Sequence, residues 1–479
     1  MALLCCWSAA APLCAYDIYN ALPGALDIPG INATLRLTAN GAPIQANVFG
    51  TQTINIQAYF DTGASGVLLS DESAGYLGVT KATNGGTPIT YDDIGVGGTE
   101  TFHVSTPYYI SLAPFNDYTD IESLAAYNHT FGPIRMQIAA PVPLGSQLAG
   151  LDVFGMPVFA GKVVVINPQP ADPFNANGTA KDLLELGRMN VNVYNPGQAF
   201  TGSLTDPGIP TVAHHLKLSY ASFDRFTSVS PIGSSGPTLA HNPFIGPNPI
   251  LALETNPPAD NTPPVVLGFG SNTTTGSFLL DTGAAASMIS TGKAAALSIR
   301  YRAGTQTTEN PRLELFDPLN PSVLGTLLAD QFSLTIGGIG GTKTVAGFYL
   351  DDMILRTMEG NASNLSDPNH LHYRGAPVLV NDISVADPLT GQSLTLDGIF
   401  GMNMLTGSVE LIPDPLLGFT FGAMANGAYD WIVFDEPNGT LGLALKGEAV
   451  PEPGLVAVGL FSMLGLMLYR RKRESQTEL

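Results

Sequence analysis

The chain has 479 residues, and its 20 basic and 40 acidic side chains give a formal net charge of −20. A surface this acidic repels phosphate groups, which makes nucleic acid a poor partner. The length favours a division into two or three structural units. With 53 glycines, 37 prolines and only 13% charged residues, the composition favours a β-rich body with many turns.

The first fifteen residues, MALLCCWSAAAPLCA, are apolar, rich in small side chains and uncharged. This pattern predicts a secretory signal peptide at residues 1–15 with cleavage near Ala15, and a buried strand is the alternative. All three cysteines, Cys5, Cys6 and Cys14, lie in this segment. Its removal would leave no thiol in the mature chain, which excludes disulfides, cysteine nucleophiles and cysteine-based metal sites there.

An apolar strand at Ala58–Phe60 runs into the tight turn Asp61–Ala64, with the sequence Asp-Thr-Gly-Ala. Glycine at the third position lets the backbone turn sharply and leaves no side chain above the carboxylate. An apolar Val-Phe-Gly-Met element follows at 153–156. The connection at 195–265 is rich in proline, glycine and asparagine; its best strand candidate is residues 212–227, and residues 257–264 read as a linker.

The second half repeats these landmarks. Asp281–Ala284 is again Asp-Thr-Gly-Ala after an apolar strand, and an Ile-Phe-Gly-Met element follows at 399–402. The aspartates are offset by 220 positions and the Phe-Gly-Met elements by 246, so the second copy carries about 26 extra residues. Residues 310–321 and 358–372 are the two candidate places for them. A duplicated β-domain in which Asp-Thr-Gly is only a turn is the alternative interpretation.

Two such turns, related by a pseudo-two-fold axis, would bring the carboxylates of Asp61 and Asp281 face to face. Two close carboxylates do not both ionise easily, so they share a proton and their pKa values split. The ionised group can then take a proton from water while its protonated partner polarises a peptide carbonyl. This chemistry needs no metal, nucleotide or other cofactor.

The paired turns, each with an apolar-apolar-Gly element downstream, resemble the pepsin and retropepsin aspartic peptidases over roughly residues 26–448. The resemblance implies an all-β, bilobal fold. Two pseudo-two-fold-related β-barrel lobes, residues 16–205 and 206–448, would flank a cleft that holds Asp61 and Asp281. It implies a monomer that cleaves a peptide or protein substrate, and threonines that cross-brace the two turns. The supporting residues it implies are Thr62, Gly63, Ala64, Thr282, Gly283, Ala284, Val153, Phe154, Gly155, Ile399, Phe400 and Gly401.

The family also carries a β-hairpin flap over its cleft, often with a tyrosine. The resemblance makes Thr87–Val104 the candidate hairpin, with its turn in Gly95–Gly98, and Tyr91 the candidate flap tyrosine. An ordinary surface hairpin with an exposed tyrosine is the alternative. Pepsins usually have serine or threonine where this chain has Ala64 and Ala284, whereas retroviral enzymes also have alanine. Losing a hydrogen bond to the charged form should raise the pKa of the pair, so we expect activity closer to neutral pH than in pepsins.

The C-terminal segment at 449–479 has three parts in order: Pro451, Glu452 and Pro453, then an uncharged stretch to Tyr469, then a basic cluster. The cluster comprises Arg470, Arg471, Lys472 and Arg473. This order resembles the PEP-CTERM sorting signal, and a permanent membrane anchor is the alternative. The resemblance implies export through the inner membrane, a transient membrane helix, recognition by an exosortase, and delivery to the outer surface or beyond.

Other catalytic motifs are absent from the sequence. There is no His-Glu-x-x-His zinc motif and no Gly-x-Ser-x-Gly elbow. The glycine-rich run at 337–341 lacks the lysine of a P-loop and favours a hairpin turn. The main rival function is a non-catalytic surface or matrix-binding module that retains the peptidase fold.

Overall fold

The computed structural model describes fifteen stretches of the chain, within residues 16–446, and the protein is predominantly β. The described residues are 16–19, 23–25, 28–48, 50–53, 55–114, 127–141, 151–168, 189–203, 206–221, 241–253, 260–386, 393–406, 408–413, 420–426 and 428–446. The expected signal peptide at 1–15 and the expected sorting signal at 449–479 lie outside them. In the described part of the chain, no helix is both long and apolar enough to cross a membrane.

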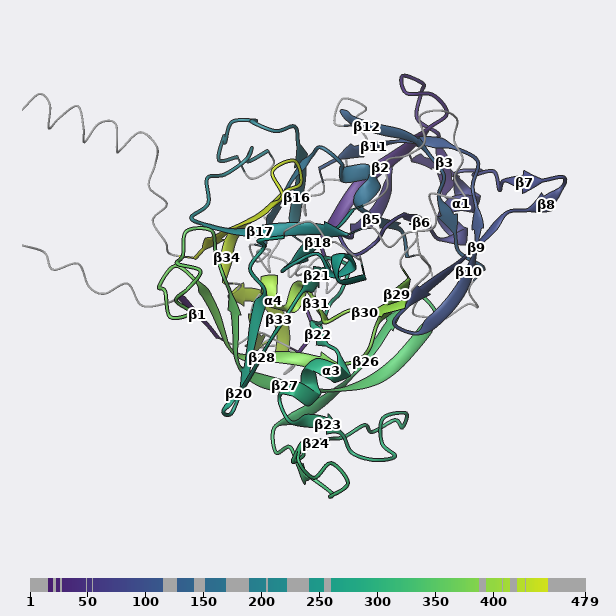
Figure 1. Cartoon of the computed structure of the whole chain (residues 1–479). Helices are drawn as coiled ribbons and strands as arrows, with labels where there is room; N and C mark the ends of the chain where they lie inside the picture. Colours follow the sequence, from purple (N-terminus) through teal and green to yellow (C-terminus); the bar gives the residue numbers. More distant parts are fainter. Residues whose placement is uncertain are drawn as a thin grey trace, which may run out of the picture.

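The first half builds a nine-stranded sheet in the order β12-β11-β2-β5-β14-β6-β13-β10-β9 (Figure 1). Its strands are β2 (Gly30–Arg36), β5 (Ile56–Phe60), β6 (Val67–Leu69), β9 (Thr90–Gly95), β10 (Gly98–Val104), β11 (Tyr108–Ala113), β12 (His129–Ile134), β13 (Gln137–Ile138) and β14 (Val153–Phe154). Strand β5 alternates buried and exposed residues along Ile-Gln-Ala-Tyr-Phe, the pattern of a strand with one face on the core. Phe60, the last of these, is fully buried just before the first Asp-Thr-Gly turn.

A fifteen-stranded sheet joins both halves of the chain. Its main path is β16-β15-β34-β35-β17-β18-β21-β31-β22-β28-β27-β19-β20, with β1 added to β28 and β26 added to β27. These strands are β1 (Tyr16–Ile18), β15 (Val163–Asn167), β16 (Asn190–Tyr194), β17 (His214–Ala221), β18 (Asn242–Ile245), β19 (Val265–Phe269), β20 (Asn272–Gly276), β21 (Phe278–Leu280), β22 (Met288–Ile289), β26 (Gln331–Gly338), β27 (Gly341–Leu355), β28 (Leu371–Val380), β31 (Gly398–Phe400), β34 (Tyr429–Asp435) and β35 (Thr440–Leu445). Because β15 pairs with β34, strands far apart in sequence hold the two halves together.

Short elements complete the described fold. They are α1 (Asp71–Tyr76), α3 (Thr291–Ala296), α4 (Met402–Thr406), the 3-10 helices η2 (Met156–Phe159) and η4 (Pro249–Leu253), and the strands β3 (Ala46–Val48), β4 (Thr51–Thr53), β7 (Thr83–Asn84), β8 (Thr87–Pro88), β23 (Ile299–Tyr301), β24 (Leu313–Leu315), β25 (Thr326–Leu327), β29 (Ser384–Ala386), β30 (Ser393–Thr395), β32 (Ser408–Pro413) and β33 (Thr420–Asn426). Helices α1 and α3 begin alike, because the hydroxyls of Ser70 and Ser290 each accept a backbone N–H from the first turn.

The two halves repeat one arrangement around each Asp-Thr-Gly turn. Strand β14 pairs parallel to β5 and antiparallel to β6, while β31 pairs parallel to β21 and antiparallel to β22. A hairpin follows the helix in each half: β9–β10 turns at Val96 and Gly97, and β26–β27 turns at Ile339 and Gly340. These turns are offset by 243 positions, against 220 for the aspartates, so most of the extra residues precede the second hairpin. Of the two candidate places, the structure therefore favours the one at 310–321.

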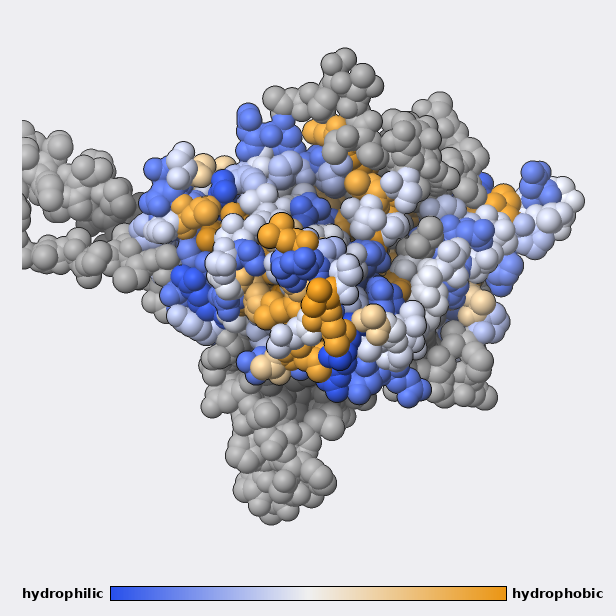
Figure 2. All heavy atoms as spheres, turned by 60° about the horizontal axis from the view of Figure 1, so that its bottom comes forward, coloured by the Kyte–Doolittle hydropathy of each residue, from blue (hydrophilic) through white to orange (hydrophobic). Residues whose placement is uncertain are grey.

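The three-stranded sheet β23-β24-β25 lies between α3 and the second hairpin, in the stretch that holds most of the extra residues. Several large apolar side chains are exposed there: Leu315, Leu319, Val323, Leu324 and Leu327. Figure 2 brings this side of the molecule forward and shows apolar groups among polar ones. A cavity of about 320 Å³ lies between this sheet and α3, lined partly by Arg300, Tyr301 and Asp382. None of the predicted site residues lines it.

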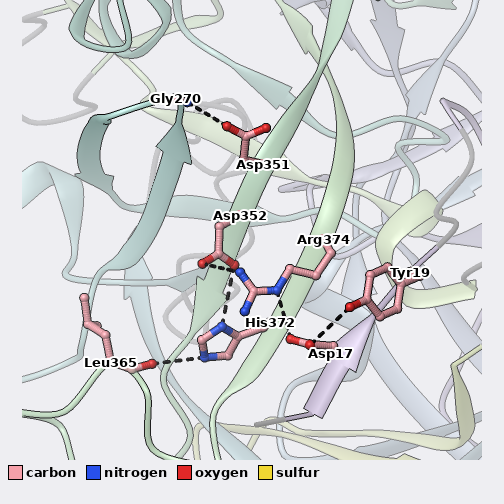
Figure 3. Close-up of polar contacts among 8 residues, drawn as sticks. All are labelled: Asp17, Tyr19, Gly270, Asp351, Asp352, Leu365, His372 and Arg374. Atoms are coloured by element: carbon pink, nitrogen blue, oxygen red, sulfur yellow. Dashed lines mark hydrogen bonds and ion pairs between the residues drawn. The ribbon is translucent and has the colours of Figure 1, made fainter.

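The N-terminal strand β1 is held on β28 in parallel register, with Asp17 opposite His372. Figure 3 shows how charge supports this pairing. The guanidinium of Arg374 lies 2.9 Å from Asp17 and 2.9 Å from Asp352, and His372 lies 3.6 Å from Asp352. Ala25 is held beside the second Asp-Thr-Gly turn, because its N–H donates to the Ala285 carbonyl at 2.7 Å.

Candidate active site

Each aspartate is held by the turn that follows it. The N–H groups of Gly63 and Ala64 donate to Asp61 Oδ1 at 2.8 and 3.0 Å. The second turn repeats this geometry, since Gly283 and Ala284 donate to Asp281 Oδ1 at 3.0 and 2.9 Å. Two backbone donors therefore hold one oxygen of each carboxyl group in the same way.

The two threonines join the turns across 220 residues of sequence. The Thr62 hydroxyl donates to the Leu280 carbonyl at 2.6 Å, and its oxygen accepts the Thr282 N–H at 3.1 Å. Thr282 does the same in reverse, donating to the Phe60 carbonyl at 2.6 Å and accepting the Thr62 N–H at 3.0 Å. Both threonines are buried, so this network of four hydrogen bonds fixes the relative position of the turns.

Each glycine of the motif faces the opposite carboxyl group. A Cβ atom on Gly63 would lie 2.4 Å from Cγ of Asp281, and one on Gly283 would lie 2.3 Å from Cγ of Asp61. Real Cβ atoms do not approach other atoms so closely, so no other residue fits here without moving an aspartate. This close approach brings the two carboxyl groups into hydrogen-bond contact with each other.

The strands predicted to pack behind the turns lie there. Asp61 N–H donates to the Phe154 carbonyl and Asp281 N–H to the Phe400 carbonyl, both at 3.0 Å. In β14, Val153 lies opposite Tyr59 of β5, and in β31, Ile399 lies opposite Leu279 of β21. Gly155 and Gly401 follow these strands, and a Cβ on either would lie within 2.8 Å of a backbone carbonyl oxygen, that of Ala64 or Ala284.

Burial raises the pKa of the carboxyls of Asp61 and Asp281 above that of an ordinary aspartate. For Asp281, the neighbouring Asp61 adds to this effect, and its pKa lies well above the usual range. At Asp61 the hydrogen bonds from Asp281, Gly63 and Ala64 oppose the effect of burial. The pair therefore holds one proton to a higher pH than isolated carboxyls do.

The two hairpins meet tip to tip (Figure 1). The Gly97 N–H donates to the Ile339 carbonyl at 3.0 Å, and the Gly340 N–H donates to the Glu100 carboxylate at 3.2 Å. A Cβ on Gly97 would lie 2.4 Å from the carbonyl carbon of Gly340, so the backbones touch directly. The expected flap of the first half is thus joined to a matching hairpin of the second half.

The hairpins also pack beside the second Asp-Thr-Gly turn. Partly buried apolar side chains from both hairpins and from the turn itself lie against one small hydrophobic cluster: Val96, Ala284, Phe332, Leu334 and Ile336. Tyr91, the candidate flap tyrosine, lies on β9 opposite Phe102 and is partly buried. Its role over the cleft stays a prediction.

Three contributions were not found from the sequence. Asn242, in the connection between the halves, bonds to the first turn; Ala25 bonds to the second turn; and Ile339 with Gly340 forms the partner of the flap. The second hairpin did have a sequence signal, the glycine-rich run at 337–341. Once the extra residues are allowed for, this run follows Asp281 as the glycine-rich turn at 95–98 follows Asp61. The other two are contacts between residues far apart, which no local pattern marks.

A search of protein-family models found no match to the chain, and no curated protein matches it. Among the residues that the structure describes, no group of three or more His, Cys, Asp or Glu side chains is arranged to hold a metal ion.

Proposed function

We propose that the protein is an aspartic endopeptidase with a bilobal, pepsin-like fold, and that Asp61 and Asp281 activate the attacking water. The supporting observation is the reciprocal geometry of the two turns, in which each glycine faces the opposite carboxyl group. The threonine network fixes the spacing of the turns, as a pair that shares one proton requires.

In the proposed reaction, Asp281 carries the shared proton and Asp61 is ionised. Asp61 takes a proton from water as the water oxygen attacks the peptide carbonyl carbon, and Asp281 gives its proton to the carbonyl oxygen. The resulting gem-diol collapses when Asp61 passes its proton to the leaving nitrogen and Asp281 recovers a proton from a diol hydroxyl. Both aspartates end in their starting protonation states.

The substrate we propose is an extended peptide with apolar side chains near the cleaved bond. The apolar side chains of Val96, Leu334 and Ile336 beside the second turn favour such a substrate. Because the hairpin tips touch, substrate entry would require them to separate, which makes the two hairpins a lid.

The C-terminal sequence motif supports an exported protein that an exosortase sorts to the cell surface. The proposed activity would then act in the envelope or outside the cell. The rival function, a binding module without turnover, predicts peptide binding by a folded protein that cleaves nothing.

The test is cleavage of a mixed peptide library by the full chain from pH 3 to 7, with Asp281→Asn and Asp330→Asn compared. Asp330 is an exposed aspartate outside the site and serves as the matched control. The proposal predicts that wild type and Asp330→Asn cleave peptides and that pepstatin inhibits this cleavage. Folded Asp281→Asn should cleave no peptide. Failure of folded wild type to cleave at any pH would favour the binding module.

A further inference from the structure

Asn242 is the first residue of β18 and lies outside both Asp-Thr-Gly turns, yet its side chain contacts the first turn three times. Its Nδ2 donates to the Thr62 carbonyl at 3.1 Å and to the Gly63 carbonyl at 3.0 Å. Its Oδ1 accepts the Ser65 hydroxyl at 2.6 Å. The residue is 1% exposed, so these bonds form away from water.

The two backbone carbonyls fix which way the amide points, because each can only accept a hydrogen bond. With Oδ1 toward the Ser65 hydroxyl, the NH₂ group faces the two carbonyl oxygens. The reversed orientation would place an amide oxygen against two other oxygens, without a proton between them.

The two carbonyls belong to the peptide groups that hold Asp61. The carbonyl of Thr62 and the N–H of Gly63 share one peptide group, and the carbonyl of Gly63 and the N–H of Ala64 share the next. Both N–H groups donate to Asp61 Oδ1, at 2.8 and 3.0 Å. Two hydrogen-bond chains therefore run from the single Asn242 amide, through two peptide groups, to one carboxylate oxygen.

Hydrogen bonds in a chain polarise one another, so a donor at the carbonyl strengthens the N–H at the other end of the same peptide group. A stronger N–H donor favours the charged form of the carboxyl that accepts it. Asn242 thus favours a negative charge on Asp61 without touching it.

The second turn has the same four residues and the same internal bonds but a different support. Its Ala285 carbonyl accepts a backbone N–H from Ala25 at 2.7 Å. Asn403 is a buried asparagine near the second turn, as Asn242 is near the first. Its Oδ1 accepts hydrogen bonds from the N–H and the hydroxyl of Ser287, which lies beyond the turn. Two turns of identical sequence therefore have different surroundings, and the difference lies on the Asp61 side.

We propose that Asn242 is a positioning residue that orients and polarises the first catalytic turn, so that Asp61 rather than Asp281 is the ionised member of the pair. The catalytic meaning of this inference rests on the proposed peptidase function. The difference in ionisation between Asp61 and Asp281 does not rest on that function, because it exists whether or not the protein cleaves peptides.

The test is a carbon-13 NMR titration of the aspartate carboxyl groups in the full chain, comparing wild type with Asn242→Leu. Leucine has a similar size but no donor. We expect the lower apparent pKa of the pair to rise by roughly half a pH unit, because two bonds to the charged form weaken. Asn403→Leu removes another fully buried amide and controls for lost stability; it should leave the titration of Asp61 unchanged. An equal shift in both variants, or none in Asn242→Leu, would overturn the proposal.

A second measurement on wild type needs no variant and guards against misfolding of Asn242→Leu. The amide protons of Gly63 and Ala64 should resonate downfield of those of Gly283 and Ala284 at a pH where one proton is shared. Equal shifts in the two turns would contradict polarisation by Asn242. If wild type shows these signatures but cleaves no peptide, the peptidase proposal fails and the inference about Asn242 stands.

Discussion

The hydroxyl of Thr62 donates to the backbone carbonyl of Leu280 and accepts the backbone N–H of Thr282, so one side chain makes two hydrogen bonds to the other half of the chain. Thr282 makes the reciprocal pair of hydrogen bonds, to the Phe60 carbonyl and from the Thr62 N–H. The two Asp-Thr-Gly turns are therefore one rigid unit, although they come from opposite halves of the chain.

Replacing Thr62 with valine should lower the free energy of unfolding by about 2–4 kcal/mol, because a buried carbonyl and a buried N–H lose their partner. Thr62→Ser keeps the hydroxyl and should cost about 1 kcal/mol or less through the lost methyl group. Equilibrium denaturation in urea measures both. Equal losses in the valine and serine variants would show that the hydroxyl network does not stabilise the fold.

Gly63→Ala should reduce kcat/KM by about 100-fold or more, because the new methyl group must displace the Asp281 carboxyl. Gly75→Ala is the matched control: Gly75 lies in α1, where a Cβ would meet nothing within 4 Å, and it should keep full activity. Steady-state cleavage of one peptide compares them. Gly63→Ala with activity near wild type would contradict the close approach of the turns.

The raised pKa values of the pair predict how stability depends on pH. A carboxyl whose pKa is higher in the folded protein stabilises the fold fully below its unfolded pKa of about 3.9, and this stabilisation is lost as pH rises through the folded value. Asp281→Asn removes the second charge. Its melting temperature should therefore exceed that of wild type at pH 7, by a margin that shrinks toward pH 3.5. A margin that does not change with pH would contradict the shared proton.

Gly97→Val should force the hairpin tips apart, since even a Cβ there meets the Gly340 backbone at 2.4 Å. We expect faster hydrogen exchange at the Gly340 amide and a several-fold change in KM, with little change in melting temperature. Thr99→Val, an exposed site on β10 near the tip, is the control. Unchanged exchange at Gly340 would show that the tips do not depend on this contact.

The sequence was informative where a short motif carries the geometry. Asp-Thr-Gly places a carboxylate, a cross-bracing hydroxyl and a glycine without a side chain in three consecutive residues. The glycine leaves room for the opposite carboxyl group, and the repeat of the motif indicated that two turns would meet. The predominance of β structure followed from composition and from the apolar strands around each turn.

Contacts between distant segments could not be predicted in the same way. Asn242 is about 180 residues from the peptide groups it bonds, and Ala25 is 260 residues from Ala285, so neither stands out in its local sequence. The place of the extra residues also stayed open until the register of the second hairpin fixed it. Such contacts depend on how the sheets pack against each other, and a local sequence pattern does not encode that packing.

The most direct test of the catalytic pair is a double-mutant cycle on kcat/KM with one cleaved peptide, using Asp61→Asn, Asp281→Asn and the double variant. Groups that act as one unit are non-additive, so each single variant should lose at least about 1,000-fold and the double variant little more. Losses that multiply in the double variant, or a single variant that keeps a tenth of the activity or more, would contradict a shared-proton dyad of Asp61 and Asp281.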